Sequence, residues 1–583
     1  MFRNNLKPVA CLLGWKKRLI FIFSLALFLI AGTNANAAQL GESIGFSIDP
    51  TYDISGRQEL NATLIKTGSN LYFFVDKNWW LTQNNIQQAD ILNRLEALNN
   101  EFTSKIYPRI TTTFGSEWKP GIDGDNRITI LFHPMKESVG GYFRTADEYL
   151  KLQSPDSNER EMLYITTSQF NNDKQLKIFL AHEFIHLVTF YQKDKLHNVS
   201  EEVWLNEARA EYVSTFLGYD DPYNGSNLQR RVKIFLESPG DPLTEWKGKK
   251  EDYGGLNIFT QYLVEYYGLA VLSDSLKSNQ TGIYSLNEAL SRNHFNTDFS
   301  QIFTDWTIAV TVNDCTLGPR YCFKDENLKA VRVIPGINFL PLTGKSTLSV
   351  TNVTKNWAGD WQKIIGGKGV LKLEFSSSAG LNFRVPYIIQ TVDGSSTIGF
   401  LSLDQNEKGE IYVSDFGSAN RSLIIVPTLQ TKFTGFDGVE STYPYTVTFS
   451  VMDRTPAQEA ELIAELTSQI KLLQEEIAKI QARLNAMLSK NTISCGKITT
   501  SLSFGERNSS QVRCLQEFLR SQGTVIYPEG TPITGNFLSQ TKAAVIRFQE
   551  KYASEILVPA GLINGTGFVG SRTSAVINRL LGR

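Results

Sequence analysis

The sequence predicts a multidomain protein in which an α+β domain is followed by an antiparallel β-sandwich, a coiled-coil helix and a small three-helix module. Its 583 residues exceed what one hydrophobic core usually holds, about 250 to 300 residues. The spacing of apolar residues also changes three times along the chain. The balance of 58 Lys+Arg against 59 Asp+Glu gives no electrostatic reason to expect a nucleic-acid partner.

Residues 1–37 carry the pattern of a secretory signal peptide. Basic residues precede the apolar run LIFIFSLALFLIA (19–31), which leads to small residues at Ala35 and Ala37. As a helix this run rises only about 20 Å, whereas a hydrocarbon core is about 30 Å thick, so cleavage after Ala37 is favoured over a membrane anchor. We therefore expect a secreted, extracytoplasmic protein.

A mixed pattern follows over 38–325. The runs NLYFFVD (70–76) and RITILF (127–132) predict strands, and the helical period around IQQADILNRLEALNNEF predicts a helix between them. Over 326–453 the helical period stops. Short β-rich runs, such as GVLKLEF, FRVPYII, EIYVSDF, SLIIVP and YTVTFSV, alternate with Gly, Asn and Asp turns. They predict a small antiparallel β-sandwich of jelly-roll type.

Residues 456–490 predict one long helix with a coiled-coil seam. Its apolar positions recur at spacings of three and four: Ile463, Leu466, Ile470, Leu473, Ile477, Ile480, Leu484 and Met487. Ile at the first and Leu at the second position of each heptad favour a parallel pair, and hence a homodimer. A single spacer helix is the alternative. Three further helical segments, near 509–521, 538–552 and 571–581, predict a compact module over 493–583.

The stretch AHEFIHLVTFY (181–191) carries the chemistry of a metal site. In a helix His182 and His186 lie one turn apart on one face, where both imidazoles can bind one zinc ion. Glu183, beside the first histidine, is placed to take a proton from a zinc-activated water.

The third ligand is expected on a second helix after a break at 193–200. That helix carries Glu207 and Glu211 four residues apart, so Glu207 can bind the metal while Glu211 supports a ligand imidazole. A site with a third histidine shortly after the motif is excluded because Thr189 and Gln192 stand there.

These residues resemble the gluzincin metallopeptidases, and WLNE (204–207) is similar to their signature, with Ala208 in place of the usual Gly. The similarity is closest to the hyicolysin-like branch, at GGYF (140–143), SNEREMLYI (157–165) and YGGLNIFTQYLVEYYG (253–268). The resemblance implies a thermolysin-like domain with one Zn²⁺ per chain. Without a GAMEN segment, it implies an endopeptidase acting on protein or peptide substrates.

Other polar residues are candidates for supporting roles. A donor for the oxyanion of peptide attack is expected at His197 or Tyr253. His133 and His294 are expected to be structural histidines. The segment GIDGDNR (121–127) lacks the downstream Glu of a calcium loop, so we expect an ordinary turn there.

Removal of the signal peptide with Cys11 would leave four cysteines in two sequence-local pairs. In an oxidising compartment the natural disulfides join Cys315 to Cys322 and Cys495 to Cys514. The alternative is four reduced thiols in the core.

The last region resembles the peptidoglycan-binding-domain family of three-helix modules. The matching positions are Gly505, Val512, Leu515, Gln516, Leu519, Gly535, Thr541, Ala544, Val545, Phe548, Gln549, Gly570, Thr573 and Asn578. The resemblance implies attachment to peptidoglycan at a bacterial cell envelope, although SEILVPAGLINGTG (554–567) is inserted between the second and third helices. Related modules also serve as folding or inhibitory segments.

We therefore expect a secreted zinc metalloendopeptidase that its C-terminal module targets to the cell wall. Two other classes stay open. The enzyme could cut the peptides of peptidoglycan, or the chain could be a non-catalytic surface protein for adhesion or assembly.

Overall fold

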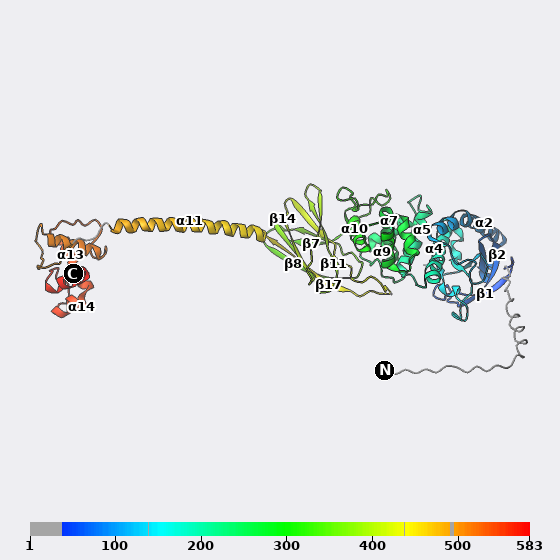
Figure 1. Ribbon diagram of the computed structural model, residues 1–583, viewed down its shortest axis with the longest axis horizontal. Coiled ribbons are helices and arrows are strands. Elements are labelled where there is room, and N and C mark those ends of the chain that lie inside the picture. Colours follow the sequence, from blue (N-terminus) through cyan, green and yellow to red (C-terminus); the bar gives the residue numbers. More distant parts are fainter. Residues whose placement is uncertain (1–37, 138, 437, 490–494) are drawn as a thin grey trace, which may run out of the picture. The chain divides into compact units, whose positions relative to one another are not determined.

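A six-stranded and a nine-stranded β-sheet, with helices between them, make up most of the part of the chain that ends at Thr455 (Figure 1). The computed structural model describes residues 38–137, 139–436, 438–489 and 495–583. The predicted signal peptide, residues 1–37, lies outside these ranges. Within them, no helix combines the length and apolar character needed to cross a bilayer. The chain packs as two units, up to Thr455 and from Pro456 onward.

The first sheet has the strand order β1-β2-β3-β4-β6-β5. Its strands are β1 (Ser43–Ser47), β2 (Glu59–Thr67), β3 (Leu71–Asp76), β4 (Ile128–His133), β5 (Gly141–Phe143) and β6 (Met162–Thr166). β3, β4 and β6 are parallel and buried on both faces, which explains their uninterrupted apolar sequences. β5 runs antiparallel to β6 at the edge of the sheet.

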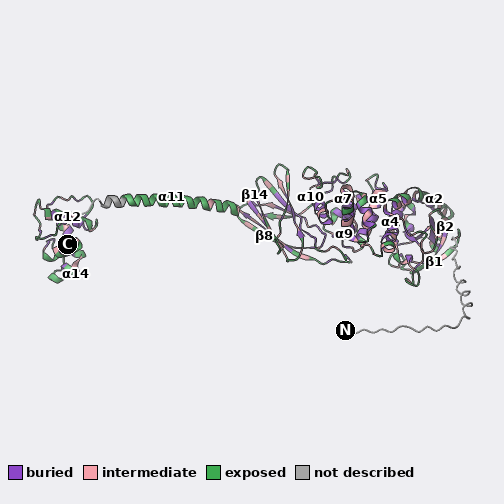
Figure 2. Cartoon of the chain, in the orientation of Figure 1, coloured by how far each residue is buried: buried purple, intermediate pink, exposed green. Residues whose placement is uncertain are grey.

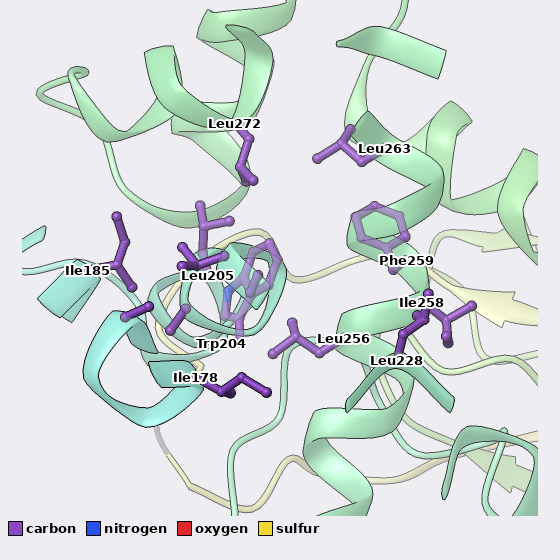
Figure 3. Close-up of a cluster of buried hydrophobic side chains, with 14 of the residues drawn as sticks. Ile178, Ile185, Trp204, Leu205, Leu228, Leu256, Ile258, Phe259, Leu263 and Leu272 are labelled. Atoms are coloured by element: carbon purple, nitrogen blue, oxygen red, sulfur yellow. The ribbon is translucent and has the colours of Figure 1, made fainter. Parts of the chain in front are cut away.

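Helices cover this sheet and continue beyond it. They are α1 (Lys77–Thr82), α2 (Asn85–Glu101), α3 (Tyr107–Phe114), α4 (Asp173–Phe190), α5 (Val203–Phe216), α6 (Asn227–Glu237), α7 (Lys250–Tyr267), α8 (Leu269–Leu276), α9 (Gly282–Arg292) and α10 (Phe299–Val312). Figure 3 shows Trp204 of α5 packed among Ile185, Leu256 and Phe259. The predicted mixture of helices and sheets is confirmed.

The β-rich region forms two sheet halves. Its strands are β7 (Gly336–Leu340), β8 (Ser346–Thr354), β9 (Gln362–Gly366), β10 (Gly369–Ser377), β11 (Phe383–Arg384), β12 (Pro386–Thr391), β13 (Ser396–Phe400), β14 (Lys408–Phe416), β15 (Asn420–Ile425), β16 (Thr428–Leu429) and β17 (Tyr443–Met452). One half has the order β14-β10-β17-β8, the other β13-β12-β15-β9-β7, and the pair Phe416–Asn420 joins them. The predicted antiparallel pairing is wrong in two places: β7 pairs with β9 in parallel, and Phe416 of β14 pairs with Asn420 of β15 in parallel.

The β-rich region and the helices share one hydrophobic core. Trp357 and Trp361 belong to the same buried cluster as Phe299 and Phe303 of α10. The indole N–H of Trp361 donates to Thr311 Oγ1 at 2.7 Å. Residues 38–325 and 326–453, expected as separate domains, are therefore one packing unit.

Both predicted disulfide pairs are bonded. Cys315 and Cys322 form a disulfide in the loop after α10, and Cys495 forms one with Cys514 in the second unit. Disulfides of this kind are typical of proteins that fold in an oxidising compartment.

The second unit begins with α11 (Pro456–Ser489), whose described side chains are exposed along its length (Figure 2). The apolar seam from Ile463 to Ile480 is 47–60% exposed. The side chains of Leu484 and Met487 lie outside the described residues. This unpartnered stripe is what a coiled coil would bury.

The same arrangement of hydrogen bonds occurs twice in the C-terminal module. Its helices are α12 (Ser510–Ser521), α13 (Ser539–Lys551), α14 (Ala553–Ile556) and α15 (Ser571–Leu580). Buried Gln516 of α12 donates to Thr541 Oγ1 at 2.8 Å and accepts from Gly535 N at 2.9 Å. Gln549 of α13 makes the equivalent bonds to Thr573 (3.0 Å) and Gly567 N (2.9 Å). Each amide thus ties a glycine turn to the next helix.

We predict that α11 pairs two copies of the chain. Light scattering over a concentration series is expected to give a mass of two chains at the upper end and one chain after truncation at Thr455. Ile470→Asp should abolish pairing because it puts a charge into the seam, whereas Ser468→Asp, on the outer face, should not. A mass of one chain at every concentration would leave α11 a spacer.

Candidate metal centre

Helix α4 presents two imidazoles on one face. His182 and His186 lie within the helix, with ring centroids 4.9 Å apart and rings nearly perpendicular. The Asn172 side chain caps the helix by accepting from Gln175 N. Apolar residues on the neighbouring positions of α4 are buried, so the orientation of the histidine face is fixed by packing.

Helix α5 brings a carboxylate to this face. Glu207 Oε2 lies 3.3 Å from His182 Nε2, and Glu207 Oε1 lies 3.6 Å from His186 Nε2. All three ligand atoms fall within 4.8 Å of one another. A tetrahedral zinc ion with bonds of about 2.1 Å separates its ligand atoms by about 3.4 Å. The spacing therefore allows these three groups to hold one metal ion.

The donor set also fits zinc chemically. Glu207 Oε2 is buried and faces His182 Nε2 at 3.3 Å. The other ring nitrogen of each histidine faces a partner: His186 Nδ1 lies 3.0 Å from Asn206 Oδ1, and His182 Nδ1 lies 3.8 Å from Glu211 Oε1. Such partners orient the Nε2 atoms toward the ion. The three groups would hold zinc and leave one position open.

Glu211 is itself firmly held. Arg231 of α6 donates to both of its carboxylate oxygens, at 2.7 and 2.6 Å, and Asn227 Nδ2 donates at 3.0 Å. Burial opposes ionisation of Glu211, but Arg231 outweighs it and lowers the pKa of Glu211 to about 2. The carboxylate beside His182 is therefore charged at neutral pH.

Glu183 lies on α4 against the edge strand β5. A Cβ on Gly141 would stand 3.0 Å from Glu183 Oε1, so the backbone of β5 passes directly beside this carboxylate. Burial raises the pKa of Glu183 to about 8, with the charge of Glu207 acting in the same direction. A divalent ion held by the neighbouring ligands would lower that pKa.

Of the two expected oxyanion donors, Tyr253 interacts with the residues of the centre. Burial and the charges of Glu207 and Glu211 raise the pKa of Tyr253, and the Arg231 guanidinium lies 4.4 Å from its ring centroid. Among the described residues, no hydrogen bond, ion pair or ring contact joins His197 to the cluster.

A second tyrosine near the centre was missed by the sequence analysis. Burial, the charge of Asp49 and then those of Glu183 and Glu207 raise the pKa of Tyr52. Tyr52 belongs to the loop between β1 and β2, more than a hundred residues before α4 in the chain. No local motif marks it, so only the fold reveals it.

The remaining polar candidates have structural surroundings. Buried His133 lies 3.3 Å from both Asp53 Oδ2 and Tyr142 OH. His294 is exposed in the turn after α9. In the GIDGDNR segment, Asp125 N donates to Asp123 Oδ1 at 2.8 Å, the local bond of an aspartate turn.

No known protein family and no curated protein matches this sequence. Solved structures with a detectable likeness include PliG, a periplasmic lysozyme inhibitor from Aeromonas hydrophila, at 10% identity over 20% of this chain and 100% of that chain, with a TM-score of 0.14. The Yersinia pseudotuberculosis-derived mitogen has 11% identity over 19% of this chain and 89% of that chain, with a TM-score of 0.13. Likenesses this weak carry no argument, so the gluzincin resemblance rests on this chain's own residues.

We predict that Glu207→Ala and His186→Ala each lose zinc, because each removes one of three protein ligands. Elemental analysis of the purified chain should find about one zinc ion per wild-type molecule. Glu211→Gln should keep the ion but bind it about 10- to 100-fold more weakly, since it alters a supporting group. Glu237→Ala, an exposed change in α6, is the control. Unchanged zinc in Glu207→Ala would place the third ligand elsewhere.

Proposed function

We propose that the chain is a secreted, zinc-dependent endopeptidase. The observation that carries the proposal is the placement of Glu183 beside two imidazoles and a carboxylate whose ligand atoms are spaced for one zinc ion. Bound zinc would polarise a peptide carbonyl and acidify water at its open position. Peptide hydrolysis needs this combination of a Lewis acid and an adjacent base.

Different side chains would transfer the proton and stabilise the negative charge of the oxyanion. Glu183 takes the proton of the attacking water and passes it to the leaving amine nitrogen. Tyr253 and Tyr52, both within the field of the Glu183 and Glu207 carboxylates, are the candidates to donate a hydrogen bond to the developing oxyanion. Their phenols are protonated at neutral pH because their pKa values are raised.

A peptide substrate has a natural place along β5. This strand lies at the edge of its sheet, and its Gly141 contacts Glu183. Edge strands bind extended peptides through main-chain hydrogen bonds. A hollow of about 810 Å³ between the start of α4 and α6, lined by Ile178, Asn227 and Arg230, gives side chains of the substrate room close to the residues that hold Glu211.

The proposed location rests on the disulfides, the N-terminal pattern and the C-terminal module. Two disulfides support an oxidising, extracytoplasmic compartment, together with the signal-peptide pattern of residues 1–37. The resemblance of the last module to peptidoglycan-binding domains supports targeting to a bacterial cell wall. The same resemblance favours a second candidate function, hydrolysis of the peptides of peptidoglycan.

We predict that Glu183→Gln keeps zinc but lowers the rate of proteolysis by about two to four orders of magnitude, because it removes only the base. Denatured protein is the substrate of choice, and a chelator should abolish wild-type activity. Glu326→Gln, at an exposed position that does not line the hollow, should cleave like wild type. Retained activity in Glu183→Gln would refute the assignment.

The substrate tested decides between the candidate functions. If the chain solubilises purified sacculi but does not cleave casein, it is a wall-peptide hydrolase. A zinc-loaded chain that cleaves neither would support the non-catalytic surface protein.

A further inference from the structure

A second group of buried carboxylates lies outside the zinc ligands. Glu148 ends a 3₁₀ turn (Thr145–Glu148) and Glu161 precedes β6, and they are 0% and 2% exposed. Both carboxylate oxygens of Glu148 and Oε2 of Glu161 are buried without any hydrogen-bond partner. A buried carboxylate without a partner costs several kcal/mol, so something must compensate it.

The neighbouring Asp147 shows what compensation by protein groups looks like. It is as fully buried as Glu148. Yet Tyr164 OH donates to its Oδ2 at 2.6 Å, and Asn158 N donates to its Oδ1 at 2.9 Å. Glu148 therefore lacks hydrogen-bond partners because of its own surroundings, and not because the whole turn is poorly bonded.

Lys195 offsets part of the charge of the pair without forming an ion pair with it. Among the described residues, neither Glu148 nor Glu161 forms an ion pair with Lys, Arg or His. The ammonium of Lys195 is close, but it donates to the backbone oxygen of Glu148, at 3.2 Å. Further negative charge comes from Asp123 and Glu117, and Oε2 of Glu117 is also buried and unpaired.

The backbone is shaped around this carboxylate group. Ile122 N donates to Glu161 Oε1 at 2.7 Å, which leaves Oε2 for another partner. Gly121 has φ +89°, and a Cβ there would stand 1.8 Å from Glu161 Oε2, so only glycine fits. Burial raises the pKa of Glu161 to about 7, with Asp123 and Glu117 adding to it, and burial and Glu161 raise that of Glu148 further.

We propose that Glu148 and Glu161 bind a divalent cation of the calcium type, with Glu117 and Asp123 at the margin of the site. All the available donors are oxygens, the choice of a hard cation, and Ca²⁺ accepts irregular ligand arrangements completed by water and backbone carbonyls. The ion supplies the positive charge that the protein lacks at this point.

The site would join three segments around β5. Glu117 and Asp123 belong to the loop between α3 and β4, and Glu148 and Glu161 flank the connection from β5 to β6. Lys195, bonded to the Glu148 backbone, follows α4. A bound ion would therefore stabilise the surroundings of β5 without contacting a zinc ligand, and its existence does not depend on the proposed function.

Calcium binding and unfolding temperature test the proposal on the full-length, zinc-loaded chain. Millimolar Ca²⁺ should raise the midpoint of thermal unfolding progressively, and calorimetry should give a dissociation constant of about 0.1 to 1 mM, as in extracellular calcium modules. Tb³⁺ should bind in competition with Ca²⁺ and luminesce by transfer from Trp118, whose ring lies 4.1 Å from the Lys195 ammonium.

Matched variants locate the site. Glu148→Gln and Glu161→Gln should weaken Ca²⁺ binding about tenfold or more, because ligand charge sets affinity, while Glu137→Gln, at an exposed position, should not. In chelator both site variants should be at least as stable as wild type, since each relieves repulsion. His186→Ala should keep the response to Ca²⁺, so a failure of the zinc assignment leaves this test intact.

Two results would overturn the proposal. One is a wild-type chain whose unfolding midpoint ignores Ca²⁺ and which binds no Tb³⁺. The other is a free energy of unfolding that rises as the pH falls through about 7 and does not change with Ca²⁺. Such a rise is expected if the carboxyl groups bind protons, because a pKa that is raised in the folded state means that protonation stabilises the fold. That pattern would show that the two carboxyl groups share a proton.

Discussion

The contact between α4 and α5 is the constraint on which the rest of the centre depends. A rotation of α5 by one residue, about 100°, would carry Glu207 away from both histidines. Packing of Trp204 and Leu205 into the core fixes that rotation. The start of α5 is fixed separately, because Glu202 accepts from Thr434 Oγ1 and Gly435 N, both at 2.9 Å, in a loop of the β-rich region.

The carboxylates of Glu207 and Glu211 and those of Glu148 and Glu161 differ in what balances their negative charge. At the proposed metal centre, Arg231 neutralises Glu211, so a bound ion would compensate chiefly Glu207. At the second group, among the described residues, no guanidinium or ammonium forms an ion pair with the Glu148 or Glu161 carboxylate, and Lys195 bonds only the backbone oxygen of Glu148. Buried carboxylates need a counter-charge from either a side chain or an ion; Arg231 supplies it to Glu211, and the proposed ions would supply it to Glu207 and to the Glu148–Glu161 pair.

Local patterns predicted the parts of the centre that are close in sequence. His182, Glu183 and His186 share one helix, and Glu207 and Glu211 share the next, so helical spacing alone placed them. Tyr52 could not be found this way, because it lies in the loop between β1 and β2 and comes near the centre only through the fold of the sheet. Arg231 did leave a signal, since it lies at helical spacing among the buried Leu228, Val232 and Phe235 of α6.

The same reasoning explains why the predicted boundary near residue 325 is not a boundary of packing. Alternating strands indicate a buried face, but they do not say which neighbour covers it. Here Trp357 and Trp361 are buried against α10, and burying each such side chain contributes about 1.5 to 3 kcal/mol or more. The loop that holds Glu202 comes from the same region. The β-rich region is therefore part of the scaffold that positions Glu207, and the first break in packing along the chain falls at Thr455.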